Sequence, residues 1–252
     1  MRTIILCEGI DDIHFLGYYL YKTNSWQRIE KNSEKEFSDY YKFPRRNNYK
    51  VEFYKKDDKR LALWSVGGKN TFKGAFKFIE EINSEYGSEY GISKVFLIRD
   101  RDNDKVENTL QEILEEMKEN KINLENIKNN TINCYNYTVE DKVYTFEIFP
   151  IIIPFEEEGA LETVLINGIR EMGEQEEYIV NKALEYVNNF IDSNRISNYL
   201  NHERLKLKAK FSSIISIINP EHSTKKLNDI LIDYPWEKNE EIKKHFKLLD
   251  KI

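Results

Sequence analysis

Short apolar runs alternate with helical patterns along the first 120 residues of the chain. The runs cover residues 3–7, 61–66 and 95–98, and they are continuous, as in strands buried on both faces. Apolar residues three or four positions apart follow the runs and predict a helix after each strand. Strand–helix alternation is typical of parallel strands joined by crossover helices. We therefore expect an α/β fold in which a mostly parallel sheet is flanked by helices.

The remainder of the chain predicts two more strands and a mainly helical C-terminal part. The two strands cover residues 132–137 and 143–153. Residues 22–58, after the first helix, are polar and rich in Tyr and Lys without a clear period, which predicts an insertion. The expected organisation is a core over residues 1–165, which contains the insertion, and a helical extension over residues 166–252, packed on the core.

Composition narrows the class of protein. A chain of 252 residues with 40% hydrophobic residues can form a sizeable core. The net charge of -6 argues against nonspecific coating of nucleic acid, but it allows a local basic patch or bridging metal ions.

Cys7 and Cys134 lie in apolar runs, so we expect reduced core residues of a cytoplasmic protein. No apolar run approaches the roughly 20 residues that span a membrane, and we expect no membrane partner.

Carboxylates follow two of the predicted strands. Glu8 comes directly after the first strand, and Asp100 and Asp102 follow the strand at 95–98. Ligands of open α/β sheets bind at the carboxyl ends of strands, and residues two apart in extended chain project to the same side. Converging carboxylates repel one another unless a hard cation such as Mg²⁺ neutralises them. Asp12 is close enough to reach this site, although it is equally suited to cap the first helix. Asp100 and Asp102 are equally suited to a solvated turn.

The residues around these carboxylates resemble the motifs of Toprim domains. Residues 7–16 are similar to the opening motif of these domains, and residues 97–102 are similar to their Asp-x-Asp motif. Residues 66–70 resemble the Gly-Gly-Lys segment, and residues 159–162 the Gly-x-Leu-Glu segment, of nucleases of the OLD (overcoming lysogenization defect) family and their small stand-alone relatives. The resemblance covers about residues 3–165.

This resemblance implies a Toprim-like fold that binds one or two Mg²⁺ or Mn²⁺ ions and acts on phosphodiester bonds. Glu8 matches a glutamate that binds metal or transfers protons, and Asp100 and Asp102 match metal-binding aspartates. Asp12 and Glu162 match acidic positions of a second metal site. OLD-type proteins also carry an ATPase domain, and this chain has no phosphate-binding loop, so a separate ATPase or another defence-system protein is an expected partner.

Basic side chains are candidates for contact with the phosphate backbone of a nucleic acid. Lys208 and Lys210 are the expected catalytic cations, because a lysine in a similar place recurs in the relatives that the chain resembles. Lys69, Arg99 and Arg101 are the expected nucleic-acid contacts. Each of these residues also fits a plainer interpretation, as part of a charged helix face or as charge balance in a loop.

The predicted insertion contains a further basic and aromatic patch. It consists of the basic pairs Arg45-Arg46 and Lys55-Lys56 together with the aromatic residues Tyr40, Tyr41 and Tyr54. This mixture suits single-stranded nucleic acid, and it is equally typical of an ordinary exposed loop.

Three functions fit the sequence to different degrees. The leading hypothesis is a Mg²⁺- or Mn²⁺-dependent nuclease that cuts DNA or RNA, with a role in defence against phage or plasmids implied by the resemblance alone. The alternative is a catalytically weak Toprim module that binds nucleic acid or a partner protein. A phosphorylated receiver domain is disfavoured by the chain length, by Glu8 and by the Asp-x-Asp spacing. Association of two or more copies is compatible with either of the first two hypotheses.

Overall fold

The computed structural model describes residues 2–29, 43–44, 50–193, 196, 198–221 and 235–252. Residues 30–42 and 45–49 of the predicted insertion, which include Tyr40, Tyr41, Arg45 and Arg46 of its basic and aromatic patch, lie outside the described residues.

The chain forms two compact units, and each is described by itself. The first unit comprises Met1–Arg99, Lys105–Ile152 and Leu248–Ile252. The second comprises Asp100–Asp104 and Ile153–Lys247. The second unit therefore takes in the Asp-x-Asp segment, and its main part begins at Ile153, earlier than the boundary expected after residue 165.

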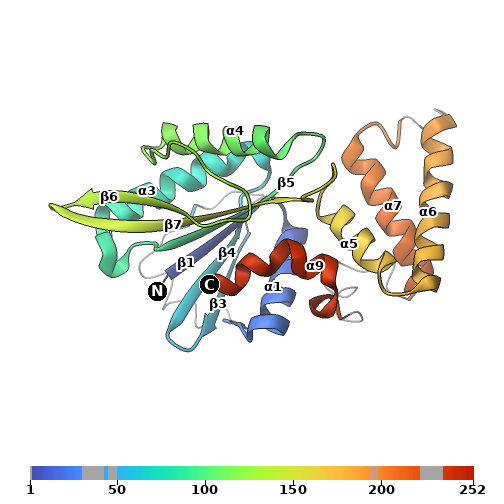
Figure 1. The fold of residues 1–252 in the computed structure, drawn as a ribbon, viewed down its shortest axis with the longest axis horizontal. Helices are drawn as coiled ribbons and strands as arrows, with labels where there is room; N and C mark the ends of the chain where they lie inside the picture. The colour runs from blue at the N-terminus through green and yellow to red at the C-terminus, as the bar shows by residue number, and fades with distance from the viewer. Residues whose placement is uncertain (1, 30–42, 45–49, 194–195, 197, 222–234) are drawn as a thin grey trace. The chain divides into compact units, whose positions relative to one another are not determined.

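A seven-stranded sheet with the order β2-β3-β4-β1-β5-β7-β6 forms the first unit (Figure 1). Its central strand β1 pairs in parallel with β4 and with β5, and Leu6 lies opposite Trp64 on one side and Leu97 on the other. The pairs β2–β3, β3–β4 and β6–β7 are antiparallel. The strands are β1 Arg2–Cys7, β2 Gln27–Arg28, β3 Lys50–Lys56, β4 Lys59–Ser65, β5 Lys94–Asp100, β6 Asn133–Val139 and β7 Lys142–Ile153. The α/β fold class is confirmed, and the parallel pairing is found at the centre of the sheet.

Helices pack on both faces of this sheet. Helices α3 (Phe72–Tyr90) and α4 (Val106–Glu119) lie on one face, and α1 (Ile10–Asn24) lies on the other (Figure 1). Alternate residues of the central strands point to the α3–α4 face, which explains why these strands are apolar throughout. The core on this face includes Ile4, Leu6, Trp64, Leu97, Phe76 and Ile113.

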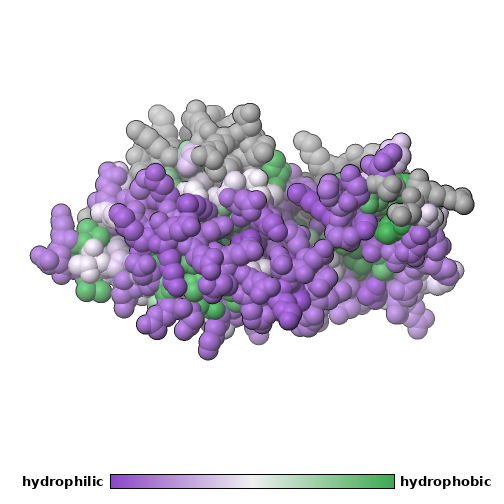
Figure 2. All heavy atoms as spheres, turned by 90° about the horizontal axis from the view of Figure 1, so that it is seen from above, coloured by the Kyte–Doolittle hydropathy of each residue, from purple (hydrophilic) through white to green (hydrophobic). Residues whose placement is uncertain are grey.

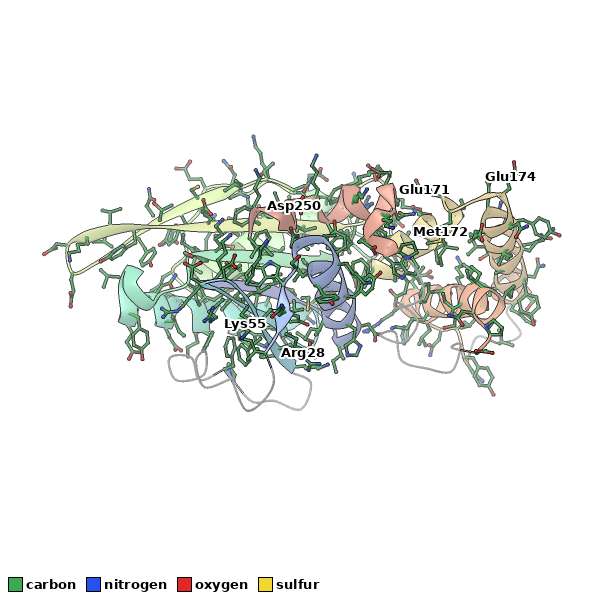
Figure 3. All side chains as sticks on the ribbon, turned by 90° about the horizontal axis from the view of Figure 1, so that it is seen from below. Arg28, Lys55, Glu171, Met172, Glu174 and Asp250 are labelled. Atoms are coloured by element: carbon green, nitrogen blue, oxygen red, sulfur yellow. The ribbon has the colours of Figure 1, made fainter. Side chains whose placement is uncertain are left out.

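The two edges of the sheet differ in charge. Arg28 and Lys55 extend from the β2–β3 edge (Figure 3), whereas β6 at the opposite edge contains no charged residue. Side chains of β6 alternate between partly buried and exposed. Cys134 is on the exposed side, so the expectation of a buried core cysteine is wrong for this residue, although it is right for Cys7. Both are free thiols.

The second unit is mainly helical, as the sequence predicts for the C-terminal part. Its helices are α5 Leu161–Arg170, α6 Glu174–Ser193, α7 Glu203–Ile218, η3 Trp236–Lys238 and α9 Glu240–Phe246, and η4 Lys247–Lys251 follows. α5 packs against α6, α7 and α9, and its apolar face is buried together with residues such as Ile214 and Ile242. Among the described residues, no helix combines the length and the apolarity that crossing a membrane requires. The surface seen in Figure 2 is predominantly hydrophilic.

A buried asparagine joins α3 to the chain before β5. The amide nitrogen of Asn83 donates to the carbonyl of Ile92 at 3.2 Å, and its oxygen accepts from the Ile92 N–H at 2.7 Å. We predict that Asn83→Ala lowers the free energy of unfolding by about 1–3 kcal/mol, because two buried backbone groups lose their partner. Urea unfolding checks this, with Ser84→Ala at the exposed neighbouring position as the control. Equal stability of the two variants would contradict the prediction.

Candidate functional site

Glu8 lies at the carboxyl end of β1, where the sheet of the first unit stops. Its carbonyl accepts hydrogen bonds from the Gly67 N–H at 3.1 Å and from the Ser65 hydroxyl at 3.3 Å, so the backbone is fixed by the chain that follows β4. Its side chain is 17% exposed, and its Oε1 lies 3.8 Å from the Nε of Arg99. Glu8 is therefore held at a strand end with a cation beside its carboxylate.

Asp12 lies in the first turn of α1, the helix that follows Glu8. Its Oδ2 accepts a hydrogen bond from the Gly9 N–H at 2.8 Å, which satisfies one of the backbone donors at the start of α1. This contact supports the helix-capping interpretation of Asp12. A role in a second metal site stays a prediction.

Arg99 is 3% exposed and packs against side chains of α3 and α4. Its Nη2 donates to Glu112 on α4, and its guanidinium carbon lies 5.8 Å from the centre of the Phe72 ring. Its Nε and Nη1 have no hydrogen-bond partner within the part of the chain that the structure describes. A buried cation of this kind cannot reach a nucleic-acid phosphate, so the predicted contact of Arg99 is not supported. Its position suits orientation of the Glu8 carboxylate.

A third carboxylate, that of Glu116, interacts electrostatically with this arginine. Burial raises the pKa of Glu116 on α4, and the charge of Arg99 acts in the opposite direction. The buried guanidinium thus lies among carboxylates from β1 and from α4, which stabilises a charge that is costly to bury alone.

Lys69 follows a glycine turn after β4. Gly67 and Gly68 have φ angles of 84° and 126°, a region that side chains disfavour, and the Thr71 hydroxyl contacts the carbonyls of Val66 and Gly68. Lys69 begins a short 3₁₀ helix and is partly exposed. This position is compatible with the predicted contact to nucleic acid, which stays a prediction.

The Asp-x-Asp segment is bound to the Gly-x-Leu-Glu segment in the second unit. Asp102 and Gly159 exchange two backbone hydrogen bonds of 2.7 Å each, and the Oδ1 of Asp100 accepts from the Leu161 N–H at 3.0 Å. Asp100 therefore lies at the N-terminus of α5, where the helix dipole favours a negative charge. Gly159 has a φ of 140°, and a Cβ at this position would collide with the side chain of Thr163.

Two further predicted residues meet in the same unit. Glu162, on the first turn of α5, forms an ion pair of 3.1 Å with Lys208 of α7. Their side chains are 16% and 36% exposed, respectively. Lys210 is partly exposed on the same helix, and the Nε of Arg101 donates to the carbonyl of Asp104 at 2.6 Å. The structure thus brings Lys208 to a predicted acidic residue, and it gives Arg101 a role in shaping its own loop.

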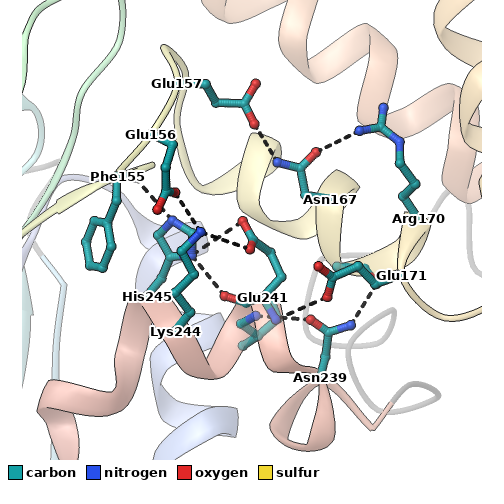
Figure 4. A network of polar contacts seen from close by, with 12 residues as sticks. Phe155, Glu156, Glu157, Asn167, Arg170, Glu171, Asn239, Glu241, Lys244 and His245 are labelled. Atoms are coloured by element: carbon teal, nitrogen blue, oxygen red, sulfur yellow. Dashed lines mark hydrogen bonds and ion pairs between the residues drawn. The ribbon is translucent and has the colours of Figure 1, made fainter.

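An acidic and histidine cluster of the second unit was not predicted (Figure 4). Ligand atoms of Glu156, Glu241 and His245 lie within 4.8 Å of one another. Nε2 of His245 accepts from the Phe155 N–H at 3.2 Å, and its Nδ1 lies 2.9 Å from the carbonyl of Glu241. Lys244 pairs with Glu156 at 2.7 Å. Lys244 also lies 3.5 Å from Glu241, so both ring nitrogens and both carboxylates have protein partners, which indicates a structural role.

This cluster escaped the sequence analysis because its members are 85 or more residues apart, except for one helical pair at four-residue spacing. Within the described residues, no comparably close group of three ligands includes Glu8, Asp100, Asp102 or Glu162.

Comparison with known proteins assigns the chain to a family. A family described as "Protein of unknown function (DUF3226)" matches residues 2–248. The chain belongs to the DUF3226 family. A search of curated proteins gave no match. Among solved structures, this DUF3226 chain is similar to the hypothetical protein PH0156 from Pyrococcus horikoshii OT3, with a TM-score of 0.49 and 18% identity over 100% of this chain and 98% of that chain.

The buried arginine of this DUF3226 protein provides a stability test. We predict that Arg99→Met lowers the free energy of unfolding by about 1–3 kcal/mol, because the charged hydrogen bond to Glu112 and the pairing of nearby carboxylates are lost. Arg204→Met, at an exposed position of α7, is the control and should change stability by less than about 0.5 kcal/mol. Urea denaturation measures both. A loss at Arg99 no larger than that at Arg204 would show that the buried pairing contributes nothing.

Proposed function

We propose that this protein is a Mg²⁺- or Mn²⁺-dependent nuclease that hydrolyses phosphodiester bonds in DNA or RNA. The observation that carries the proposal is the joining of separate predicted motifs. Asp100 and Asp102 are bonded to the segment Gly159–Leu161, whose next residue, Glu162, pairs with Lys208. Residues brought together from three distant parts of the sequence are hard to explain as unrelated surface charges.

The pairing of strands in the first unit supports the inclusion of Glu8 in the proposed metal site. β1 and β5 are parallel neighbours, and Leu6 lies opposite Leu97. Glu8 comes two residues after Leu6, and Asp100 comes three residues after Leu97 and directly after Arg99. Glu8 and Arg99, which directly precedes the Asp-x-Asp segment, therefore lie at the same edge of the sheet.

The chemistry of these donors fits Mg²⁺ or Mn²⁺. Carboxylate oxygens are the protein ligands that such hard cations prefer. Mg²⁺ keeps several waters and is commonly held by one or two carboxylates together with substrate phosphates. A closely packed set of three ligands is therefore not required. Glu8, Asp100 and Asp102 would hold the ion, with Asp12 and Glu162 as candidates for a second one, and bound metal supplies charge stabilisation at the phosphate and a more acidic water.

The protein side chains would contribute orientation and charge. Glu8 is suited to accept a proton or hold an ion, since its carboxylate is kept in place by Arg99. Lys208 neutralises Glu162 without substrate and would offer its ammonium group to a phosphate oxygen in the complex. Lys210 and Lys69 are further candidates for phosphate contact. The resemblance to OLD nucleases supports a role in defence against phage or plasmids, with a separate ATPase as a candidate partner.

A variant that lacks the charge of Glu8 distinguishes the nuclease hypothesis from the binding-module hypothesis. We predict that Glu8→Gln lowers Mn²⁺-supported cleavage of labelled DNA or RNA about 100-fold or more, because the variant keeps the size of the side chain but loses its charge. The exposed Glu107→Gln on α4 is the matched control and should cleave at the wild-type rate. Equal cleavage by Glu8→Gln and wild type would assign the activity to a contaminant or another site. A folded wild type without cleavage of any substrate would favour the module that only binds nucleic acid or a partner protein.

Metal binding provides an independent test. We predict that Asp100→Asn/Asp102→Asn weakens Mn²⁺ binding at least about tenfold, an effect that even outer-shell partners of a metal typically reach. Asparagine retains an oxygen that can accept the Leu161 N–H, so the loop should persist. The matched control is Asp57→Asn/Asp58→Asn at the exposed turn between β3 and β4. Titration calorimetry with identical affinities for both double variants would reject the site.

A further inference from the structure

A cavity of about 370 Å³ lies in the first unit between α3 and the β6–β7 hairpin. Ile79, Glu80 and Ser84 line it from α3, Tyr135 and Tyr137 from β6, and Phe146 from β7. Its size is at the lower end of the roughly 300–1,000 Å³ of small-molecule sites. An apolar floor with polar groups at the rim is typical of such sites.

The cavity is far from the strand ends that carry Glu8. The Glu147 N–H donates to the Ser93 carbonyl, which precedes β5, and the Arg101 N–H, after β5, donates to the carbonyl of Ile153. β7 therefore runs parallel to β5, and the start of the hairpin extends beyond the amino end of β5 (Figure 1). From Tyr144 to Ile152, β7 spans about 26 Å.

Two tyrosine rings that line the cavity are nearly parallel. The planes of Tyr135 and Tyr137 differ by 13°, and their centroids are 6.5 Å apart, so the rings form a stacked pair. Aromatic side chains are surfaces on which nucleobases stack, because every base has a π-face. The pair therefore offers a planar ligand an aromatic surface at the cavity.

Both rings are held in position before any ligand arrives. The Tyr135 hydroxyl donates to the Lys121 carbonyl at 2.9 Å. Tyr137 contacts its cross-strand neighbour Tyr144 at a centroid distance of 5.6 Å. Burial, followed by the neighbouring Tyr144, raises the pKa of Tyr137, so the phenol stays neutral at pH 7. Rigid neutral rings bind an aromatic ligand with little loss of side-chain entropy.

The rim of the cavity carries hydrogen-bonding groups that suit the edge of a base. The Ser84 hydroxyl donates to Glu80 at 3.1 Å, and Lys121 lies 3.9 Å from the same carboxylate. β6 itself has no charge. These features favour a neutral, planar ligand with a polar edge over one that is bound mainly through its charge.

We propose that this cavity binds a nucleobase, stacked on the rings of Tyr135 and Tyr137, with Glu80 and Ser84 meeting its polar edge. The base belongs to a nucleoside or to a single-stranded nucleic acid. Binding at the cavity does not depend on the proposed nuclease activity. If the base belongs to a nucleic-acid substrate, several nucleotides are needed to span the distance along β7 from the cavity to the carboxyl end of the sheet.

The test measures the fluorescence anisotropy of a fluorescein-labelled 12-nucleotide oligo(dT) and oligo(U), with EDTA present to prevent cleavage. We expect wild-type binding, and we expect Tyr137→Leu to weaken it about 5- to 100-fold, the loss that removal of one stacking residue produces. Tyr137→Phe keeps the ring and should bind like wild type. Tyr178→Leu removes an exposed tyrosine of α6 and is the matched control.

A second variant keeps the test decisive if Tyr137→Leu does not fold. Ser84→Trp fills the cavity from an exposed helix position, leaves both tyrosines in place and should weaken binding as well. Competition by adenosine identifies a nucleoside as the source of the base, whereas competition by oligonucleotides alone identifies single-stranded nucleic acid. The proposal is overturned if wild type binds neither labelled oligonucleotides nor adenosine, or if folded Tyr137→Leu and Ser84→Trp bind like wild type.

Discussion

The parallel pairing of β1 with β4 and β5 is the constraint on which the candidate chemistry depends. Residues 3–7 of β1 are buried, and no charged side chain follows Arg2 until the strand ends, at Glu8. β4 and β5 run in the same direction, and the glycine turn at Gly67 and the buried Arg99 therefore reach the same edge. The backbone hydrogen bond from Gly67 to Glu8 fixes this edge directly.

Arg99 shows how a charge is kept inside this arrangement. A buried guanidinium is costly unless carboxylates pair with it, and here α4 supplies Glu112 while the end of β1 supplies Glu8. The Phe72 ring covers the guanidinium at the start of α3. The orientation of Glu8 is thereby coupled to the packing of two helices on the sheet, and a change in helix packing would alter the carboxylate.

Sequence patterns predicted the framework because its physical signals are local. The apolar runs of β1, β4 and β5 and the turn at Gly67 are visible within a few residues. The burial of Arg99 could not be predicted, since its partners on α3 and α4 are distant in sequence and the residue lies next to two aspartates. The same limit applies to His245, whose ring accepts a hydrogen bond from residue 155.

Glu162 and Lys208 were predicted as separate site residues only through the resemblance to OLD nucleases, since neither residue has a distinctive periodicity, and their ion pair was not predicted. Cys134 was assigned to the core from its apolar neighbours. β6 proved to be the last strand of the sheet, where one side of each pleat is exposed. Position in the sheet order is a tertiary property, so it could not be read from the run of residues itself.

The charge distribution limits how such a protein could hold nucleic acid. The net charge of the chain is -6. In the first unit Glu8 lies beside Arg99, and in the second unit Glu162 pairs with Lys208, so each of these carboxylates has a cationic partner within its own unit. Little positive charge is therefore left there to attract a phosphate backbone. Affinity would have to come from bridging metal ions and from aromatic stacking, which weakens less in salt than ion pairing does. Under the two proposals made above, the tyrosine pair on the uncharged edge strand would supply the stacking, and the carboxylates after β1 and β5 would hold the ions.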